Sequence, residues 1–104
     1  MAHNRLTAGL RAIHPGEVLR EDVLPALRLT KSDIAAHLGV SRQTLHDILA
    51  ERRPVTAQMA LRIGKLCGNG PDIWLRLQNT YDLRHAEKTM GKMLAKIPTL
   101  SSAA

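Results

Sequence analysis

Apolar residues recur every three or four positions through most of this chain, which is the spacing of one buried face on an α-helix. Two short segments of this kind lie within residues 30–54 and are separated by Gly39 and Val40. Thr30 and Ser41 precede the two segments, and a hydroxyl at that position caps the free N–H groups of a helix start. Gly39 readily takes the left-handed conformation that ends a helix. The pattern therefore predicts a helix-turn-helix.

Three apolar residues define the buried face of each of these two helices. They are Ile34, Ala35 and Leu38 in the first helix, and Leu45, Ile48 and Leu49 in the second. The short side chain of Ala35 suits a point where two helix backbones cross at about 90–120°.

Another helix is predicted before this pair. It is expected to begin at His14-Pro15-Gly16-Glu17, because proline and acidic residues are both favoured in a first helical turn. Its apolar residues are Val18, Leu19, Val23 and Leu24. Pro25 is expected to end this helix or to kink it, because proline lacks an N–H and its ring clashes with the preceding turn.

A fourth helix is predicted over residues 57–67, with Thr56 as its cap. The run Gly68-Asn69-Gly70 should end it, because these residues tolerate positive φ. Cys67, at the end of this helix, is interpreted as a small buried filler.

The last helix is predicted to be long, over about residues 71–95, with a break near Arg84 or Gly91 left open and Pro98 as its stop. Its second half has apolar residues on one side: Leu83, Met90, Leu94 and Ile97. A basic stripe of unassigned role lies on the opposite side: Arg84, Lys88, Lys92 and Lys96.

The composition favours an all-α fold. The chain has 104 residues with no Phe, one Trp and one Tyr, so its core must be mostly aliphatic. Strict alternation of apolar and polar residues is absent. We predict one five-helix domain over residues 14–97, a flexible N-terminal arm over 1–13 and a disordered tail over 98–104.

The N-terminal arm contains Arg5 and Arg11 and no acid. A mobile terminus is the favoured interpretation. A basic arm that reaches DNA is an alternative, whereas the apolar part is too broken for a secretory signal.

The charge of the chain favours a polyanionic partner, because the net charge is +6 and the pI is about 10.3. The second helix of the pair opens with polar side chains of the types that read base edges in a major groove. Lys31, Arg52 and Arg53 flank them and suit phosphates. The sequence thus predicts sequence-specific binding of double-stranded DNA. The predicted DNA-binding residues are Lys31, Ser41, Arg42, Gln43, Thr44, His46, Arg52 and Arg53.

Two more specific expectations concern this stretch. Gln43 is the first choice for base readout, of adenine, and Arg42 contacts either guanine or phosphate. The acids of the stretch, which are Asp33, Asp47 and Glu51, can lie away from the leading turn of the second helix.

Other chemistries find no support in the sequence. The single Cys67 and the spacing of the five histidines fit no metal site, and no nucleophile motif or phosphate loop is present. We therefore expect no enzyme, no cofactor and no metal. No apolar run is long enough to span a membrane, and a cytoplasmic protein is the default.

Trp74, Leu77 and Tyr81 lie on one face of the last helix. Such residues are most often core, but a domain this small has little core left for so long a helix. We therefore predict that they contribute to a dimer interface.

Several separated motifs resemble those of the HigA/VapI-type antitoxins, which belong to the Cro- and repressor-like (XRE) helix-turn-helix proteins. They are His14-Pro15-Gly16-Glu17-Val18-Leu19, Leu38-Gly39-Val40-Ser41-Arg42, Arg53-Pro54-Val55-Thr56 and Trp74-Leu75-x-Leu77-Gln78-x-x-Tyr81-Asp82. The resemblance implies a five-helix repressor-like domain and a homodimer formed largely through the fifth helix. It also implies a HigB-like toxin partner, of the RelE type that cleaves mRNA, and repression of the operon that encodes both, through a palindromic operator.

Two alternatives remain at this point. One is a stand-alone dimeric transcriptional regulator with no toxin partner. The other is an interaction adaptor whose basic stripe binds an acidic protein or a membrane.

Overall fold

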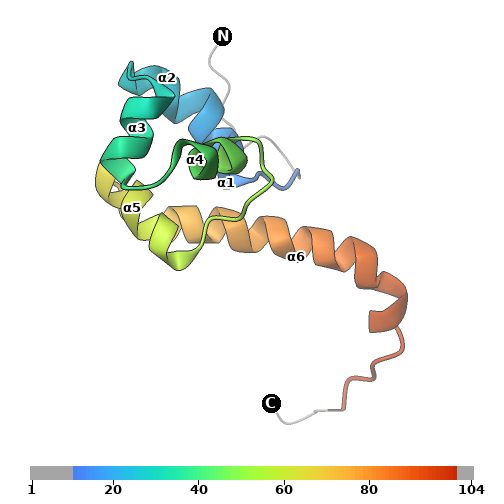
Figure 1. Cartoon of the computed structure of the whole chain (residues 1–104). Helices are drawn as coiled ribbons and strands as arrows, with labels where there is room; N and C mark the ends of the chain where they lie inside the picture. Colours follow the sequence, from blue (N-terminus) through green and yellow to red (C-terminus); the bar gives the residue numbers. More distant parts are fainter. Residues whose placement is uncertain (1–10, 101–104) are drawn as a thin grey trace.

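The computed structural model describes residues 11–100, in which helices are joined by short loops and no strand is present (Figure 1). The elements are α1 (Pro15–Val18), η2 (Leu19–Val23), α2 (Leu24–Leu27), α3 (Lys31–Leu38), α4 (Arg42–Leu49), α5 (Ala57–Cys67) and α6 (Asp72–Leu94). Because α1, η2 and α2 follow one another without a gap, they form one helical segment. The all-α fold with five helical units and a long last helix is confirmed.

The first helical segment continues through Pro25. Its middle part, η2, is a π-helical turn, in which the N–H of Leu24 donates to the carbonyl of Leu19, five residues earlier. This wider turn takes up the distortion, and the helix runs on to Leu27 before Arg28 adopts a left-handed conformation with φ 57°. Of the two alternatives predicted for Pro25, an end or a kink, the end of the helix at this residue is therefore wrong.

The helix starts predicted from hydroxyl residues are confirmed. The hydroxyl oxygens of Thr30, Ser41 and Thr56 accept hydrogen bonds from the third backbone N–H that follows each, at 3.1, 3.0 and 3.2 Å. Gly39 ends α3 in the left-handed conformation, with φ 72°. The turn between α3 and α4 therefore has the geometry that its sequence predicts.

The six residues predicted to form the buried faces of α3 and α4 are all buried, and Ile48 is fully so. Residues from α5 and the start of α6 complete the core, including Met59, Ile63 and Trp74. Gly16 in α1 lies directly against the carbonyl oxygen of Ile48, where a Cβ would find no room. The first helical segment thus packs against the backbone of α4 itself.

The last helix, α6, is unbroken from Asp72 to Leu94 and ends before Pro98, so the alternative break near Arg84 or Gly91 does not occur. Its first half packs on α5 and α1, while every residue from Asp82 to Leu100 is exposed. The second half therefore projects from the rest of the domain (Figure 1).

Residues 11–13 pack on the domain, although they belong to the arm that the sequence predicts to be flexible. The guanidinium of Arg11 forms two hydrogen bonds of 2.8 Å with the carboxylate of Glu17, and Ile13 is buried. The rest of the predicted arm and the last residues of the predicted tail, 101–104, lie outside the described residues.

Candidate nucleic-acid interface

Four of the predicted DNA-binding residues line one open hollow of about 470 Å³. They are Lys31 at the start of α3, and Arg42, Gln43 and His46 on α4. All four side chains are exposed, whereas the opposite face of α4 is buried in the core. Donor and acceptor groups therefore stand together on the outer face of α4, as a helix that enters a DNA groove requires.

Ser41 and Thr44, also predicted to bind DNA, contact each other. The Ser41 hydroxyl donates to Oγ1 of Thr44 at 2.9 Å, while its oxygen accepts from the Thr44 N–H. These two hydroxyls thus hold the first turn of α4, and Thr44 is half-buried.

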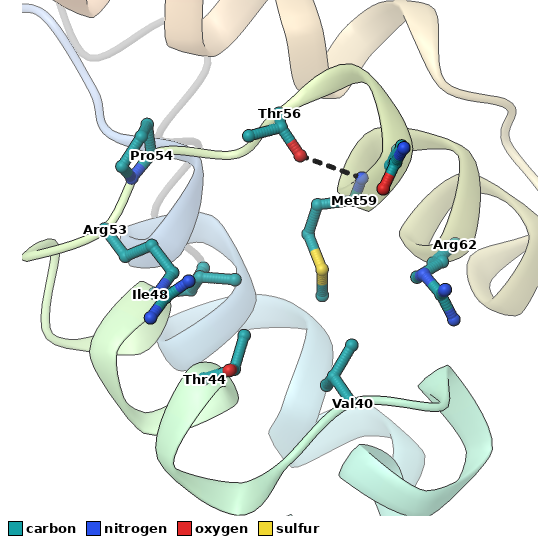
Figure 2. Close-up of a pocket in the computed structure, with 9 residues that line it drawn as sticks. Val40, Thr44, Ile48, Arg53, Pro54, Thr56, Met59 and Arg62 are labelled. Carbon is teal, nitrogen blue, oxygen red and sulfur yellow. Dashed lines mark hydrogen bonds between the residues drawn. The ribbon is translucent and has the colours of Figure 1, made fainter.

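A second hollow, of about 320 Å³, lies on the other side of α4, between this helix and α5 (Figure 2). Thr44 and Val40 lie on its α4 side, and Arg53 and Arg62 flank the side chain of Met59. The guanidinium of Arg62 also donates to the Leu38 carbonyl at 2.7 Å, which ties α5 to the end of α3. Basic side chains therefore lie on both sides of α4.

The basic loop that follows α4 carries Arg52 and Arg53, both exposed. Nη2 of Arg52 lies 3.5 Å from Oδ1 of Asp47. Asp47 also accepts a hydrogen bond of 2.9 Å from the Gln43 amide, so this acid contacts the leading turn of α4 rather than lying away from it. Glu51, in contrast, pairs with Arg20 at 3.2 Å, toward the first helical segment.

Gln78 of α6 fixes the far end of this loop. Its Oε1 accepts from the Val55 N–H at 2.8 Å and its Nε2 donates to Asp82 at 2.9 Å. Gln78 is only 5% exposed, and its hydrogen bond with Val55 is buried and so protected from water.

His14 joins the first helical segment to α6. Its Nδ1 accepts from the Gly16 N–H at 2.9 Å, and its ring forms a T-shaped pair with the Tyr81 ring at a centroid distance of 4.9 Å. Burial lowers the pKa of His14, and the carboxylates of Glu51 and Asp82 only partly oppose this effect.

The lowered pKa of His14 predicts a loss of stability at acid pH. The unfolded chain takes up a proton at about pH 6.5 that the folded protein resists, so the contribution is present above that pH and is lost as the pH falls through the folded pKa. Urea unfolding at pH 7.5 and 5.5 should show a larger loss for the parent protein than for His14→Asn, which keeps an acceptor at this helix start. Equal losses would contradict this account.

The chain is similar to known proteins over most of its length, although no family model matches it. The Virulence-associated protein I of Dichelobacter nodosus is 38% identical over 92 residues, which cover 88% of this chain and 85% of that protein. The structure of Pseudomonas aeruginosa antitoxin HigA with the higBA promoter matches 88% of this chain and 100% of that one, with a TM-score of 0.82 and 36% identity.

The chain belongs to the HigA/VapI-type antitoxin family. A further structure, of antitoxin GraA in complex with its operator, matches 90% of this chain and 96% of that one, with a TM-score of 0.82 and 39% identity. Since these matches cover 88% and 90% of this chain, the HigA/VapI-type fold extends over most of it.

Within this HigA/VapI-type fold, the three residues predicted for a dimer interface have different environments. Trp74 is 2% exposed, and its indole N–H donates to Asn69 at 3.1 Å, so it belongs to the core of the single chain. The prediction for Trp74 is corrected accordingly. Leu77 and Tyr81 are half-buried, and the Tyr81 ring contacts the rings of His14 and His85.

Two residues of the candidate nucleic-acid interface were not predicted from the sequence. Gln78 was quoted within a motif without a role, and nothing local indicates that it reaches Val55, 23 residues away. Asp47 was expected only to avoid the leading turn, although its spacing of four residues from Gln43 is a signal for a side-chain pair on a helix.

Other kinds of site find no support in the part of the chain that the structure describes. Within residues 11–100, no group of three or more His, Cys, Asp and Glu side chains is placed to hold a metal ion. No described helix has both the length and the apolar character needed to cross a membrane. Burial raises the pKa of the Cys67 thiol, which is half-buried.

Proposed function

We propose that this chain is a DNA-binding antitoxin that represses its own operon as a homodimer and neutralises a RelE-like, mRNA-cleaving toxin by binding it. The observation that carries the DNA-binding part is the hollow lined by Lys31, Arg42, Gln43 and His46. Support comes from two relatives, at 36% and 39% identity, whose solved structures include a promoter and an operator.

The projecting half of α6 supports the homodimer. The apolar side chains of this half, together with Ile97 just after the end of α6, lie along one face at spacings of three, four and seven residues and are exposed to water; they are Leu83 at 60%, Met90 at 38%, Met93 at 60%, Leu94 at 44% and Ile97 at 59%. An apolar stripe of this length is unusual on a monomer and fits burial against the same stripe of a second copy. The interface we propose thus lies further along α6 than Trp74.

In a symmetric dimer, the two copies of α4 would each enter the major groove at one half-site. The two half-sites would be about 34–36 Å apart, which is one turn of DNA. The operator should then be palindromic. The toxin-binding part of the proposal rests on membership of a family of antitoxins, and the partner is a HigB-like toxin.

Substitutions in the two kinds of predicted contact should have different effects on operator binding. Gln43→Ala should relax sequence preference, because it removes a base contact. Arg52→Ala should weaken binding to all sequences and reduce the salt slope by about 1, because it removes a phosphate contact. Gel-shift titrations with the promoter of its own gene, at several salt concentrations, measure both effects.

Lys65→Ala is a matched control for these titrations, because it removes an exposed cation of α5 that lines neither of the two hollows beside α4. It should leave preference and salt slope unchanged. If Gln43→Ala and Arg52→Ala also leave them unchanged, the proposed interface is wrong.

Co-expression with the product of the neighbouring gene tests the antitoxin role. That product should be toxic alone, harmless with this protein, and recovered with it as a complex. A neighbour without toxicity would favour the second candidate, a stand-alone dimeric regulator; several relatives carry the name of HTH-type transcriptional regulator.

A further inference from the structure

Asp47 is an acid on the face of α4 that we propose to enter DNA, where the field of the phosphates disfavours a negative charge. Its Oδ1 accepts a hydrogen bond of 2.9 Å from Nε2 of Gln43, one helical turn earlier. The same oxygen lies 3.5 Å from Nη2 of Arg52. One carboxylate oxygen therefore contacts both the predicted base reader and a predicted phosphate contact.

The contact with Asp47 fixes the orientation of the Gln43 amide. A carboxylate only accepts hydrogen bonds, so the amide nitrogen must face it and the amide oxygen must point away. A flipped amide would set two oxygens against each other. Of the two N–H groups of Gln43, one is committed to Asp47, which leaves one donor and one acceptor free.

This remaining pair matches one purine better than the other. In the major groove adenine presents an acceptor, N7, beside a donor, the N6 amino group, whereas guanine presents two acceptors, N7 and O6. One free N–H and one carbonyl therefore satisfy adenine completely. To pair with both acceptors of guanine, Gln43 would need both of its N–H groups, and the second would have to leave Asp47.

We propose that Asp47 is a positioning residue that makes Gln43 prefer adenine over guanine. This inference rests on the proposed DNA-binding function and names a determinant of its specificity. The nearby guanidinium of Arg52, whose side chain is 63% exposed, offsets the negative charge of Asp47, whose side chain is 23% exposed. The carboxylate is thereby tolerated close to DNA.

The test compares operator duplexes in which the A·T pairs of a half-site are replaced one at a time by G·C. The parent protein should prefer adenine over guanine about tenfold to a hundredfold at one position. Gln43→Ala should abolish this ratio, which identifies the position that Gln43 reads. Asp47→Ala should reduce the ratio at that position at least about threefold, because the Gln43 amide is no longer held in one orientation and both of its N–H groups become available.

Asp47→Asn separates orientation from charge. Its amide oxygen still accepts from Gln43, but the negative charge is lost, so the ratio should stay close to that of the parent protein. Asp47→Ala and Asp47→Asn should share any change in the salt slope, because both release Arg52. In the double variant Gln43→Ala/Asp47→Ala the ratio should equal that of Gln43→Ala alone, because Asp47 acts on the preference only through Gln43.

The outcomes separate this inference from the proposed function. If the parent protein shows no sequence preference, the proposed function and the inference both fail. If the parent selects its operator and Asp47→Ala keeps the full preference for adenine, only the inference fails. Equal loss of preference in Asp47→Ala and Asp47→Asn would assign the effect to charge and would also overturn it.

Discussion

Gly16→Ala is expected to lower the free energy of unfolding by about 3 kcal/mol, because the added methyl group would overlap the backbone carbonyl of Ile48. Ile48 is fully buried, and a backbone atom cannot rotate away as a side chain can. The first helical segment would have to move off α4, which also strains the hydrogen bond between the Gly16 N–H and His14. Thermal unfolding followed by circular dichroism should show a melting temperature lower by roughly 10–20 °C.

Gly91→Ala provides the matched control for this prediction. Gly91 lies inside α6 with no neighbouring atom within 4 Å of an added Cβ, and alanine is favoured over glycine in a helix by about 1 kcal/mol. The same substitution should therefore stabilise the protein slightly at one position and destabilise it strongly at the other. A Gly16→Ala protein that melts with the parent would show that the close contact with α4 is absent.

Leu83→Ser/Met90→Ser is expected to convert the proposed dimer into a monomer. The two side chains are 60% and 38% exposed in the single chain, and their burial against a second copy would contribute about 2 kcal/mol each on both subunits. Operator affinity should fall by roughly 10²–10⁴, because the second half-site is no longer bound at a high effective concentration. Sedimentation velocity gives the oligomeric state, and gel-shift titration gives the affinity.

Lys88→Ser/Lys92→Ser is the control on the opposite face of the same helix, where the basic stripe lies. It places the same residue type on α6 but leaves the apolar stripe intact, so the dimer should persist. A dimer that survives the substitutions at Leu83 and Met90 would exclude this stripe as the interface. A monomeric parent protein would exclude the homodimer altogether.

Local signals predicted much of the fold because they act over a few residues. The hydroxyl of Thr30, Ser41 or Thr56 needs only the next turn to form its cap, and Gly39 needs only its own freedom at positive φ. The starts of α3, α4 and α5 and the end of α3 follow from these residues. Pro25 is different, because the π turn that accommodates it belongs to a helix held in place by packing.

The same distinction between local and non-local signals applies to the predicted site residues. Exposure of Arg42, Gln43 and His46 follows from the helical period once the buried face of α4 is known. Whether Trp74 belongs to the core or to an interface depends on which other parts of the chain pack against its side chain. The spacing of residues within α6 does not contain that information. The reach of Gln78 to Val55 is equally non-local.

The separation of the two faces of α4 has an evolutionary consequence. Leu45, Ile48 and Leu49 hold the helix in the core, whereas Arg42, Gln43 and His46 contribute little to that packing because they are exposed. Substitutions on the outer face should therefore be nearly neutral for stability. A duplicated copy of such a gene can then change the operator that it recognises by single mutations without losing its fold. Related repressors in one genome thereby come to bind different operators.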